Sequence, residues 1–158
     1  MPETRLLHEG GRNHFLAKRF DRTSDGGKIH MQTLNGLAHF DFNMARVHGY
    51  EDVMRIALRS DVPPDYRAEL YRRMVFNVIA RNQDDHTKII SFLMARDGRW
   101  RRSPAYDVTY AYNPTGRWTG THQMLVNGRV DGFTTDDLLA AATPARLKVG
   151  EPQRIIRE

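Results

Sequence analysis

Cysteine is missing from this sequence, so no disulfide can hold the chain together. Long apolar runs are missing too, because none approaches the ~18 consecutive apolar residues of a membrane-spanning helix. The first residues, MPETRLLHEGG, lack the apolar region of a secretory signal peptide. Together these absences predict a cytoplasmic chain without a membrane segment.

Internal repeats and low-complexity linkers are also absent, so the sequence gives no sign of several linked domains. Its 158 residues fit one domain, and an apolar share of 40% with a charged share of 27% is ordinary for a soluble protein. A globular chain of this size buries roughly 70% of its unfolded surface. We therefore expect a single domain with a sizeable core.

Acidic residues are outnumbered, with 19 Asp and Glu against 24 Lys and Arg and a net charge of +5. This excess favours anionic partners such as nucleotide, RNA or DNA, without identifying one. The positive charge is scattered, and its densest cluster is Arg99, Arg101 and Arg102 around Trp100. A solvated edge strand whose charges block further strand pairing explains this cluster better than a binding site does.

The first third of the chain predicts one hairpin and one short helix. Residues 14–20 have the apolar content of a strand, and the Asp-Gly-Gly chemistry of residues 21–28 could fold that strand back. A helix is expected over residues 37–45, after an interruption by Asn35 and Gly36.

Two helices are predicted in the middle of the chain. Residues 50–59 place apolar side chains on one face and acids in the first turn. The next helix has the clearest start, because Asp61 can cap it and Pro63 and Pro64 suit a first turn. Its apolar residues then recur at fourfold spacing, at Tyr66, Leu70, Met74 and Val78.

The remainder of the chain predicts hairpins, a loop and short helices. We expect a hairpin from strands 89–94 and 100–103, a loop over residues 111–123, and a two-residue hairpin turn at Asn127-Gly128. Thr134 or Thr135 caps a further helix, and residues 153–158 form a short helix or a frayed end. The elements as a set predict an α+β fold.

The segment RNQDDHTKIISF, residues 81–92, holds the densest group of functional side chains. We call residues 82–88 the polar loop; it follows a predicted helix and precedes an apolar strand. Asp84 or Asp85 could supply hard oxygen ligands to Mg²⁺ or Mn²⁺, with phosphate and water completing the shell and Asp107 as the second carboxylate.

Two other interpretations fit the same loop. One aspartate could act as a general base on a hydroxyl nucleophile, with Lys88 neutralising a transferring phosphoryl group. Alternatively the loop is an Asx-turn in which His86 is hydrogen-bonded to the backbone, with no chemistry at all. The predicted hairpin between Asp84 and Asp107 favours chemistry, because it is a compact way to return two acids to one place. Protein kinases place a base and a metal-binding aspartate in this way.

RNQDDHTKIISF followed by SPAYD closely resembles the HipA family of serine/threonine kinases, the toxins of bacterial type II toxin–antitoxin pairs. The family pattern is close to N-x-D-x-H-x-K-N-x-S-F and then P-x-Y-D. The matching residues are Asn82, Asp84, His86, Lys88, Ser91, Phe92, Pro104, Tyr106 and Asp107. Upstream, residues 19–22 (RFDR) resemble the family segment at the hinge between the kinase lobes.

This resemblance implies a mostly helical, protein-kinase-like C-lobe with short β-hairpins around the active-site loop, using Mg²⁺ and ATP. It implies Asp84 as catalytic base, with Lys88 near the phosphates and His86 orienting the loop. It also implies Asp107 as a magnesium ligand. Phe20, Asp21 and Tyr106 would lie around the adenosine. The alternatives are core packing for Phe20 and Tyr106, and for Asp21 an Asx-turn or an ion pair with Arg19 or Arg22.

The sequence departs from the family pattern in two ways. The asparagine expected five residues after the base, a magnesium ligand, is Ile89 here, and Asp85 is the nearest substitute. The glycine-rich phosphate loop and the ATP-contacting lysine of the nucleotide-binding lobe are also missing. Residues 1–158 are therefore expected to form a single HipA-like C-terminal kinase subdomain, without the N-terminal nucleotide-binding lobe.

Three functional hypotheses follow. The first is phosphoryl transfer from Mg-ATP to a protein hydroxyl in a toxin–antitoxin system, with the missing lobe supplied in trans or upstream. The second is a degenerate module that binds an antitoxin or a sibling kinase subunit and meets nucleic acid only through the antitoxin. The third is a metal-dependent phosphohydrolase built from Asp84, Asp85, His86 and Asp107, with His122 as an extra ligand. The alternative for His122 is an exposed side chain without a role.

Overall fold

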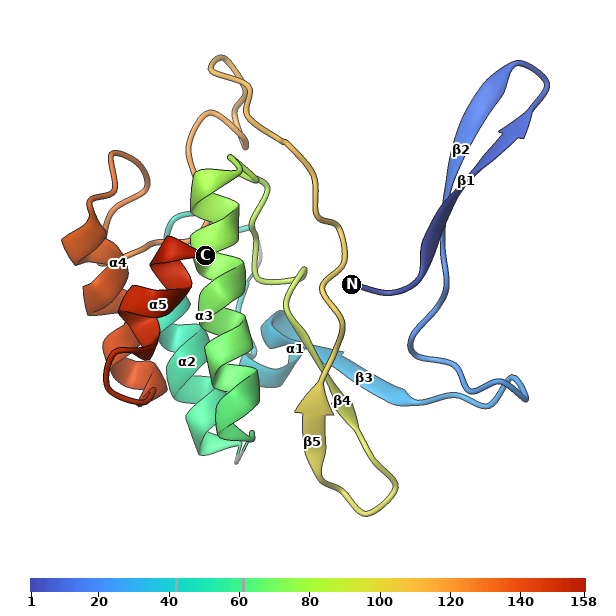
Figure 1. The fold of residues 1–158 in the computed structure, drawn as a ribbon, viewed down its shortest axis with the longest axis horizontal. Coiled ribbons are helices and arrows are strands. Elements are labelled where there is room, and N and C mark those ends of the chain that lie inside the picture. Colours follow the sequence, from blue (N-terminus) through green and yellow to red (C-terminus); the bar gives the residue numbers. More distant parts are fainter. Residues whose placement is uncertain (42, 61) are drawn as a thin grey trace.

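The structure is a computed structural model that describes residues 1–41, 43–60 and 62–158. Three strands are followed by three helices, two further strands and the C-terminal helices, and the strands form two small antiparallel sheets (Figure 1). The predicted α+β class is confirmed. The strands are β1 (Thr4–Glu9), β2 (Arg12–Ala17), β3 (His30–Thr33), β4 (Ser91–Met94) and β5 (Trp100–Arg102). The helices are α1 (Leu34–Ala38), α2 (Tyr50–Arg59), α3 (Pro64–Ile79), α4 (Thr135–Ala142), the 3₁₀ turn η1 (Thr143–Ala145) and α5 (Glu151–Arg157).

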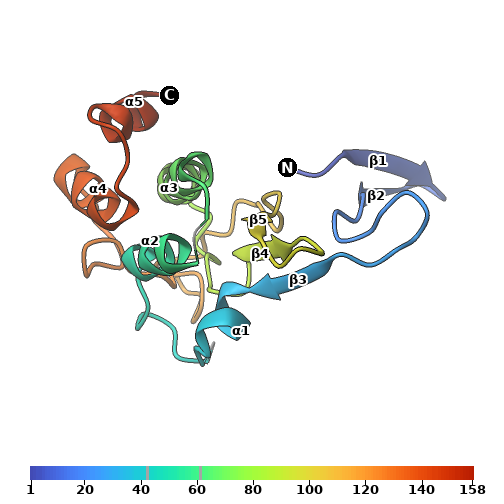
Figure 2. The same ribbon diagram turned by 90° about the horizontal axis from the view of Figure 1, so that it is seen from below.

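Helix α3 is the centre of the molecule. Helices α2, α4 and α5 lie on one side of it and the sheet of β3, β4 and β5 on the other, as the view from below shows (Figure 2). Buried apolar side chains of α2 and α3 belong to one continuous apolar core. The largest fully buried ones on these two helices are Tyr50, Met54, Tyr66, Leu70, Tyr71 and Met74. This core fixes the end of α3, from which the polar loop starts.

Helix α2 has the predicted bounds, and helix α3 has the predicted start. Helix α2 begins after Gly49, whose N–H donates to the Asp52 carboxylate over 3.0 Å, so an acid in the first turn satisfies the helix start. Helix α3 begins at Pro64, as the proline pair predicts. Asp61, the predicted cap, lies outside the described residues.

The three-stranded sheet follows the order β3-β4-β5, with both pairs antiparallel. Phe92 on β4 is fully buried and meets Tyr66 of α3 and Trp100 of β5 edge-to-face. The predicted hairpin of β4 and β5 is confirmed. Its first strand begins at Ser91 rather than at residue 89, because the chain still turns there: the Ile89 N–H donates to the His86 carbonyl over 3.1 Å.

The first hairpin was predicted with the wrong partner strand. The strand over residues 12–17 pairs with the preceding β1, across Gly10 and Gly11, which both have positive φ. A two-residue turn of this kind suits glycine and matches the strand twist. The later Asp-Gly-Gly segment closes only a local turn, with a single bridge between Arg22 and Lys28.

The helix predicted over residues 37–45 is misplaced. Helix α1 spans Leu34–Ala38 because Thr33 caps it, accepting a hydrogen bond from the Gly36 N–H over 3.2 Å. It ends at His39, which has a left-handed φ of 54°. Asn35 therefore lies inside the helix, and part of the predicted range, residue 42, is outside the described residues.

The C-terminal predictions are confirmed in outline. Asn127 and Gly128 both have positive φ and form the predicted tight turn, although only one bridge, between Val126 and Arg129, flanks it. Thr134 caps α4 through a reciprocal contact with Asp137. Residues 151–157 form helix α5 rather than a frayed end.

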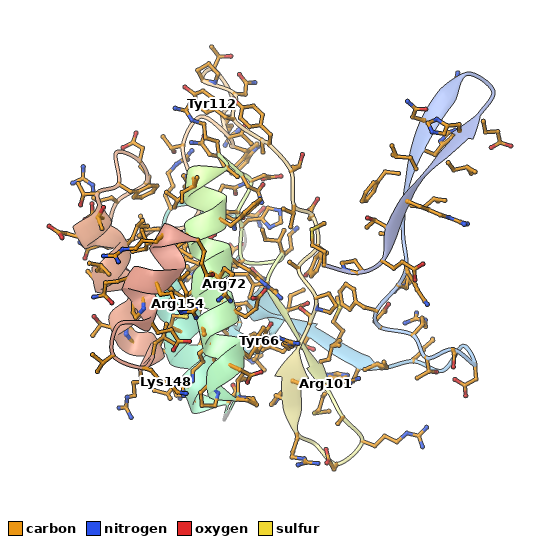
Figure 3. All side chains as sticks on the ribbon, in the orientation of Figure 1. Tyr66, Arg72, Arg101, Tyr112, Lys148 and Arg154 are labelled. Carbon is orange, nitrogen blue, oxygen red and sulfur yellow. The ribbon has the colours of Figure 1, made fainter. Side chains whose placement is uncertain are left out.

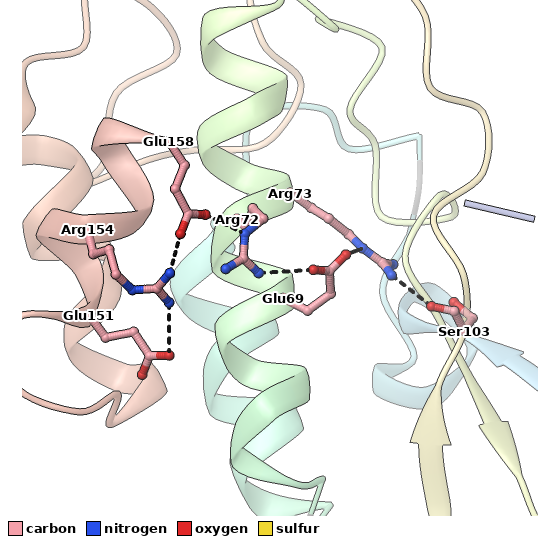
Figure 4. A network of polar contacts seen from close by, with 7 residues as sticks. All are labelled: Glu69, Arg72, Arg73, Ser103, Glu151, Arg154 and Glu158. Carbon is pink, nitrogen blue, oxygen red and sulfur yellow. Dashed lines mark hydrogen bonds and ion pairs between the residues drawn. The ribbon is translucent and has the colours of Figure 1, made fainter.

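A chain of ion pairs crosses α3 from α5 toward the sheet (Figure 4). Arg72 donates to Glu158 over 3.0 Å, and Arg73 donates to the backbone carbonyl of Ser103 over 2.8 Å. Glu69 accepts from both arginines. Arg72 of α3 and Arg154 of α5 both donate to Glu158, whereas Arg101 lies apart from them on β5 (Figure 3). The ion pairs, together with the hydrogen bond to Ser103, tie α5 to the segment that leaves β5.

Within the described residues no helix is long and apolar enough to cross a bilayer.

Candidate active site

The polar loop starts where α3 stops. Arg81 has a left-handed φ of 51°, and the next N–H, that of Asn82, donates back to the Asn77 carbonyl over 3.0 Å. This is the helix-ending arrangement in which one left-handed residue turns the chain away from the helix axis. The turn directs residues 83–88 across the ends of α2 and α3, into contact with the segment at residues 122–124.

Asp85 is an anchor. Its side chain is 0% exposed, and one carboxylate oxygen lies 3.0 Å from the Tyr50 hydroxyl and 2.8 Å from Nδ1 of His122, both of which donate to it. The other oxygen accepts from the backbone N–H of Gln123 over 2.8 Å. Because protein donors occupy both oxygens, Asp85 does not offer a substitute for the missing metal ligand.

The contacts of Asp85 extend into both central helices. The Tyr50 hydroxyl accepts from the Asn77 side-chain amide over 2.8 Å, and Asn77 accepts from the Asn82 side chain over 3.0 Å. We call Tyr50, Asn77, Asn82, Asp85 and His122 the Asp85 cluster. Burial, followed by the negative charge of Asp85, raises the pKa of Tyr50 well above its ordinary range. Tyr50 therefore remains a hydrogen-bond donor at neutral pH.

Asp84 has a different environment from its neighbour. It is half-buried, and one of its carboxylate oxygens accepts a hydrogen bond from the side-chain amide of Gln123. Lys88 is exposed. His86 is half-buried, and its Nδ1 is buried without a hydrogen-bond partner among the described residues. A hydrogen bond from His86 to the backbone, as the Asx-turn interpretation expects, is therefore not formed by this nitrogen.

A hydrogen bond joins the two sequence motifs. The Tyr106 hydroxyl donates to the backbone carbonyl of Lys88 over 2.6 Å, so the segment after β5 rests on the polar loop. Asp107, the next residue, is exposed and has a left-handed φ of 56°. Aspartate tolerates this conformation better than most residues. The structure thus brings Tyr106 to the polar loop and leaves Asp107, the residue after it, exposed to solvent.

The residues predicted around adenosine begin at the Tyr106 ring. The Phe20 ring lies 5.6 Å from it, and both side chains are half-buried. One carboxylate oxygen of Asp21 accepts a hydrogen bond from Nε of Arg19 over 2.8 Å. The other accepts from Arg19 over 2.5 Å and from Arg22 over 2.6 Å. The ion-pair alternative for Asp21 therefore describes its contacts, while an adenosine role for these three residues stays a prediction.

We predict that Asp21 stabilises the fold at neutral pH and not in strong acid. Hydrogen bonds from Arg19, and then the charges of Arg19 and Arg22, lower the pKa of Asp21 from 3.8 to about 2. A lowered pKa stabilises the folded state above pH 4, and this contribution is lost as the pH falls through about 2.

Unfolding of Asp21→Asn and of the wild type by urea, at a series of pH values, should therefore differ most at neutral pH and converge near pH 2. Arg19→Met should reproduce the trend, because it removes the main donor. A stability difference that does not change with pH would contradict this account.

Ile89 occupies the position of the expected asparagine and is only 8% exposed. Its side chain belongs to the apolar core and carries no oxygen. Among residues 1–41, 43–60 and 62–158, no group of three or more His, Asp or Glu side chains is placed to hold a metal ion. This finding removes support from the phosphohydrolase hypothesis. The exposed carboxylate of Asp107 still suits one Mg²⁺ whose other ligands are phosphate and water.

Sequence reasoning missed the segment at residues 122–124. Its Gln123 contacts both aspartates, and its His122 is a buried partner of Asp85 rather than an exposed side chain or a metal ligand. The only signal was a histidine in a stretch rich in Gly and Thr. Contacts between residues 37 to 39 positions apart leave no local pattern in the sequence.

Comparison with known proteins supports the sequence resemblance. The profile of the HipA-like C-terminal domain matches residues 1–158. No curated protein matches the chain. Among solved structures, a chain of the Shewanella oneidensis MR-1 toxin–antitoxin complex of HipA, HipB and operator DNA matches with a TM-score of 0.81 and 17% identity. The match covers 98% of this chain and 41% of that chain, and at this identity it shows the fold. Because the family profile spans its whole length, the chain belongs to the family of HipA-like C-terminal domains.

Proposed function

We propose that this chain is the C-terminal lobe of a serine/threonine protein kinase, which transfers phosphate from Mg-ATP to a protein hydroxyl. The hydrogen bond from Tyr106 to the Lys88 carbonyl carries the proposal, because it seats the P-x-Y-D segment on the polar loop. A base on the loop and a carboxylate beside it are what phosphoryl transfer needs.

Each predicted site residue has a role that suits its surroundings. Asp84, half-buried and held at one oxygen, would accept the proton of the attacking hydroxyl. Asp107 would hold Mg²⁺, which when bound neutralises developing phosphate charge. Lys88 would lie near the phosphates, and His86 would orient the loop. The aromatic pair of Phe20 and Tyr106, with Asp21, would line the adenosine site.

The partners are proposed from the solved relative. That structure is described as a complex of HipA, HipB and operator DNA, so we propose an antitoxin of the HipB type as a protein partner, with DNA reached only through it. This chain spans 41% of the matched chain. Full activity is proposed to need the polypeptide that corresponds to the remainder of a complete HipA protein.

The test is phosphate incorporation into a protein substrate with Mg-ATP, by this chain alone and together with the remaining part of a HipA protein. We expect transfer that requires Mg²⁺ and that Asp84→Asn removes. Transfer that persists in this variant, or no transfer under either condition, would refute the kinase proposal.

A second candidate is a binding module without catalysis, and the buried side chain of Ile89 favours it. The core accepts an apolar residue here where phosphoryl transfer would use an oxygen ligand. The two candidates differ in what they predict for Ile89→Asn.

We predict that Ile89→Asn lowers the free energy of unfolding by about 2–4 kcal/mol, because it places an amide where a nearly buried apolar side chain packs. Ile89→Val is the matched control, with an expected loss of about 1 kcal/mol. If the chain is a kinase short of one metal ligand, Ile89→Asn should also raise Mg²⁺-dependent transfer below its unfolding temperature. Unchanged binding of an antitoxin with no transfer in either protein would favour the binding module.

A further inference from the structure

Gln123 contacts both aspartates of the polar loop at once. Its side chain is 7% exposed, and the side-chain amide donates to one oxygen of Asp84. Its backbone N–H donates to Asp85 over 2.8 Å. Any residue except proline could supply the backbone contact at position 123, but the contact to Asp84 requires a side chain with a donor of this length.

The surroundings hold Gln123 in place. His122, the residue before it, is 2% exposed and fixed on Asp85, and the Met124 side chain after it is buried in the core. The backbone carbonyl of Gln123 accepts from the Arg46 N–H over 2.8 Å. The amide therefore projects from a segment that the Asp85 cluster anchors on one side and Arg46 anchors on the other.

The contact reaches Asp84 from a distant segment, because the two residues lie 39 positions apart in the sequence. Ile89, which follows the polar loop, has no side-chain amide and belongs to the core. The orientation of the Asp84 carboxylate is thus set in part by a buried donor from a distant segment.

We infer that Gln123 is a positioning residue for phosphoryl transfer: it holds one oxygen of Asp84, so that the other is presented to the substrate hydroxyl. This inference rests on the proposed kinase function. A carboxylate held at one oxygen keeps a fixed angle to its target, whereas a free one changes its χ1 rotamer and turns over a broad range of χ2. Small errors in the placement of a reacting group are costly, up to about 10²-fold in rate.

The experiment compares three substitutions in the protein used for the transfer assay. Gln123→Met keeps the length and bulk of the side chain and removes the donor. Gln123→Glu replaces the donor with a second carboxylate facing Asp84. Gln153→Met makes the same chemical change on the exposed face of α5 and is the matched control.

We expect Gln123→Met to lower kcat by about 10- to 100-fold with KM for ATP within about twofold, because the amide acts on the base and not on nucleotide binding. Gln123→Glu should lower kcat further and move the acid limb of the pH–rate profile to higher pH, since two facing carboxylates share a proton. Gln153→Met should match the wild type in both constants.

A second readout does not require activity. In ¹⁵N spectra, the Gln123 side-chain amide signal, identified by its loss in Gln123→Met, should move in Asp84→Asn and keep its position in Gln153→Met. A signal that does not respond to Asp84→Asn would overturn the contact itself.

The outcomes separate this inference from the proposed function. Asp84-dependent transfer that is unchanged in Gln123→Met would overturn the positioning role and leave the kinase proposal standing. Equal changes in kcat and KM, together with a lower unfolding temperature, would show that Gln123 only maintains the fold. A wild type without Asp84-dependent transfer would overturn both.

Discussion

Replacing Asp85 with alanine is expected to lower the free energy of unfolding by about 3–5 kcal/mol. The substitution removes an acceptor from four buried groups at once, namely the Tyr50 hydroxyl, the His122 ring and the backbone N–H groups of Gln123 and Met124. Buried donors that lose their partner cost about 1–3 kcal/mol each, and partial relaxation recovers some of this. Such a loss is a large share of the ~5–15 kcal/mol that stabilises a typical domain.

Urea unfolding of the two neighbouring alanine variants provides the comparison. Asp84→Ala removes the same chemical group one position earlier, where it is half-buried and accepts a hydrogen bond from the Gln123 side chain. Its expected cost is about 1 kcal/mol. Equal costs for the two variants would contradict the division of roles between anchor and base.

Asp84→Asn is expected to have the opposite profile, a decrease in transfer rate of about 10²–10⁴-fold with little change in stability. An amide cannot accept the proton of the attacking hydroxyl. It does keep a carbonyl oxygen, which can still accept from Gln123. We therefore expect the free energy of unfolding to stay within about 1 kcal/mol of the wild type.

The measurement pairs initial rates of phosphate transfer with unfolding curves on the same preparations. Asp136→Asn, an exposed substitution on α4 away from the polar loop, controls for the removal of one negative charge. The base assignment fails if Asp84→Asn loses activity only in proportion to a loss of folded protein.

Much of the fold could be predicted because its signals are local. Apolar side chains at fourfold spacing and a proline pair located α3, and an Asp-Gly turn located the hairpin of β4 and β5. The first hairpin was wrong because two glycine-containing turns follow each other closely, and the sequence does not say which of them joins strands. The short helix α1 was misplaced because Asn35 and Gly36 are poor helix formers that a threonine cap nevertheless supports.

The candidate site could be predicted only in part. The motif located Asp84, and the loop beyond α3 was expected. Two adjacent aspartates with the same chemistry cannot be told apart by composition, although one is fully buried and the other is half-exposed. The difference arises from Tyr50, His122 and Gln123, which lie 35 to 39 positions away and meet the loop only after folding.

The hairpin of β1 and β2 is useful for all of these experiments. Every residue of its two strands is exposed, and it extends away from the helices and the larger sheet (Figure 1). Its backbone amides should therefore open without waiting for the core to open, and exchange with deuterium at a rate set by the hairpin alone. In hydrogen-exchange data on the core variants, these amides serve as an internal reference. Their rate should stay constant while protection around Asp85 falls, so a change in their rate reports a difference in pH or temperature between samples.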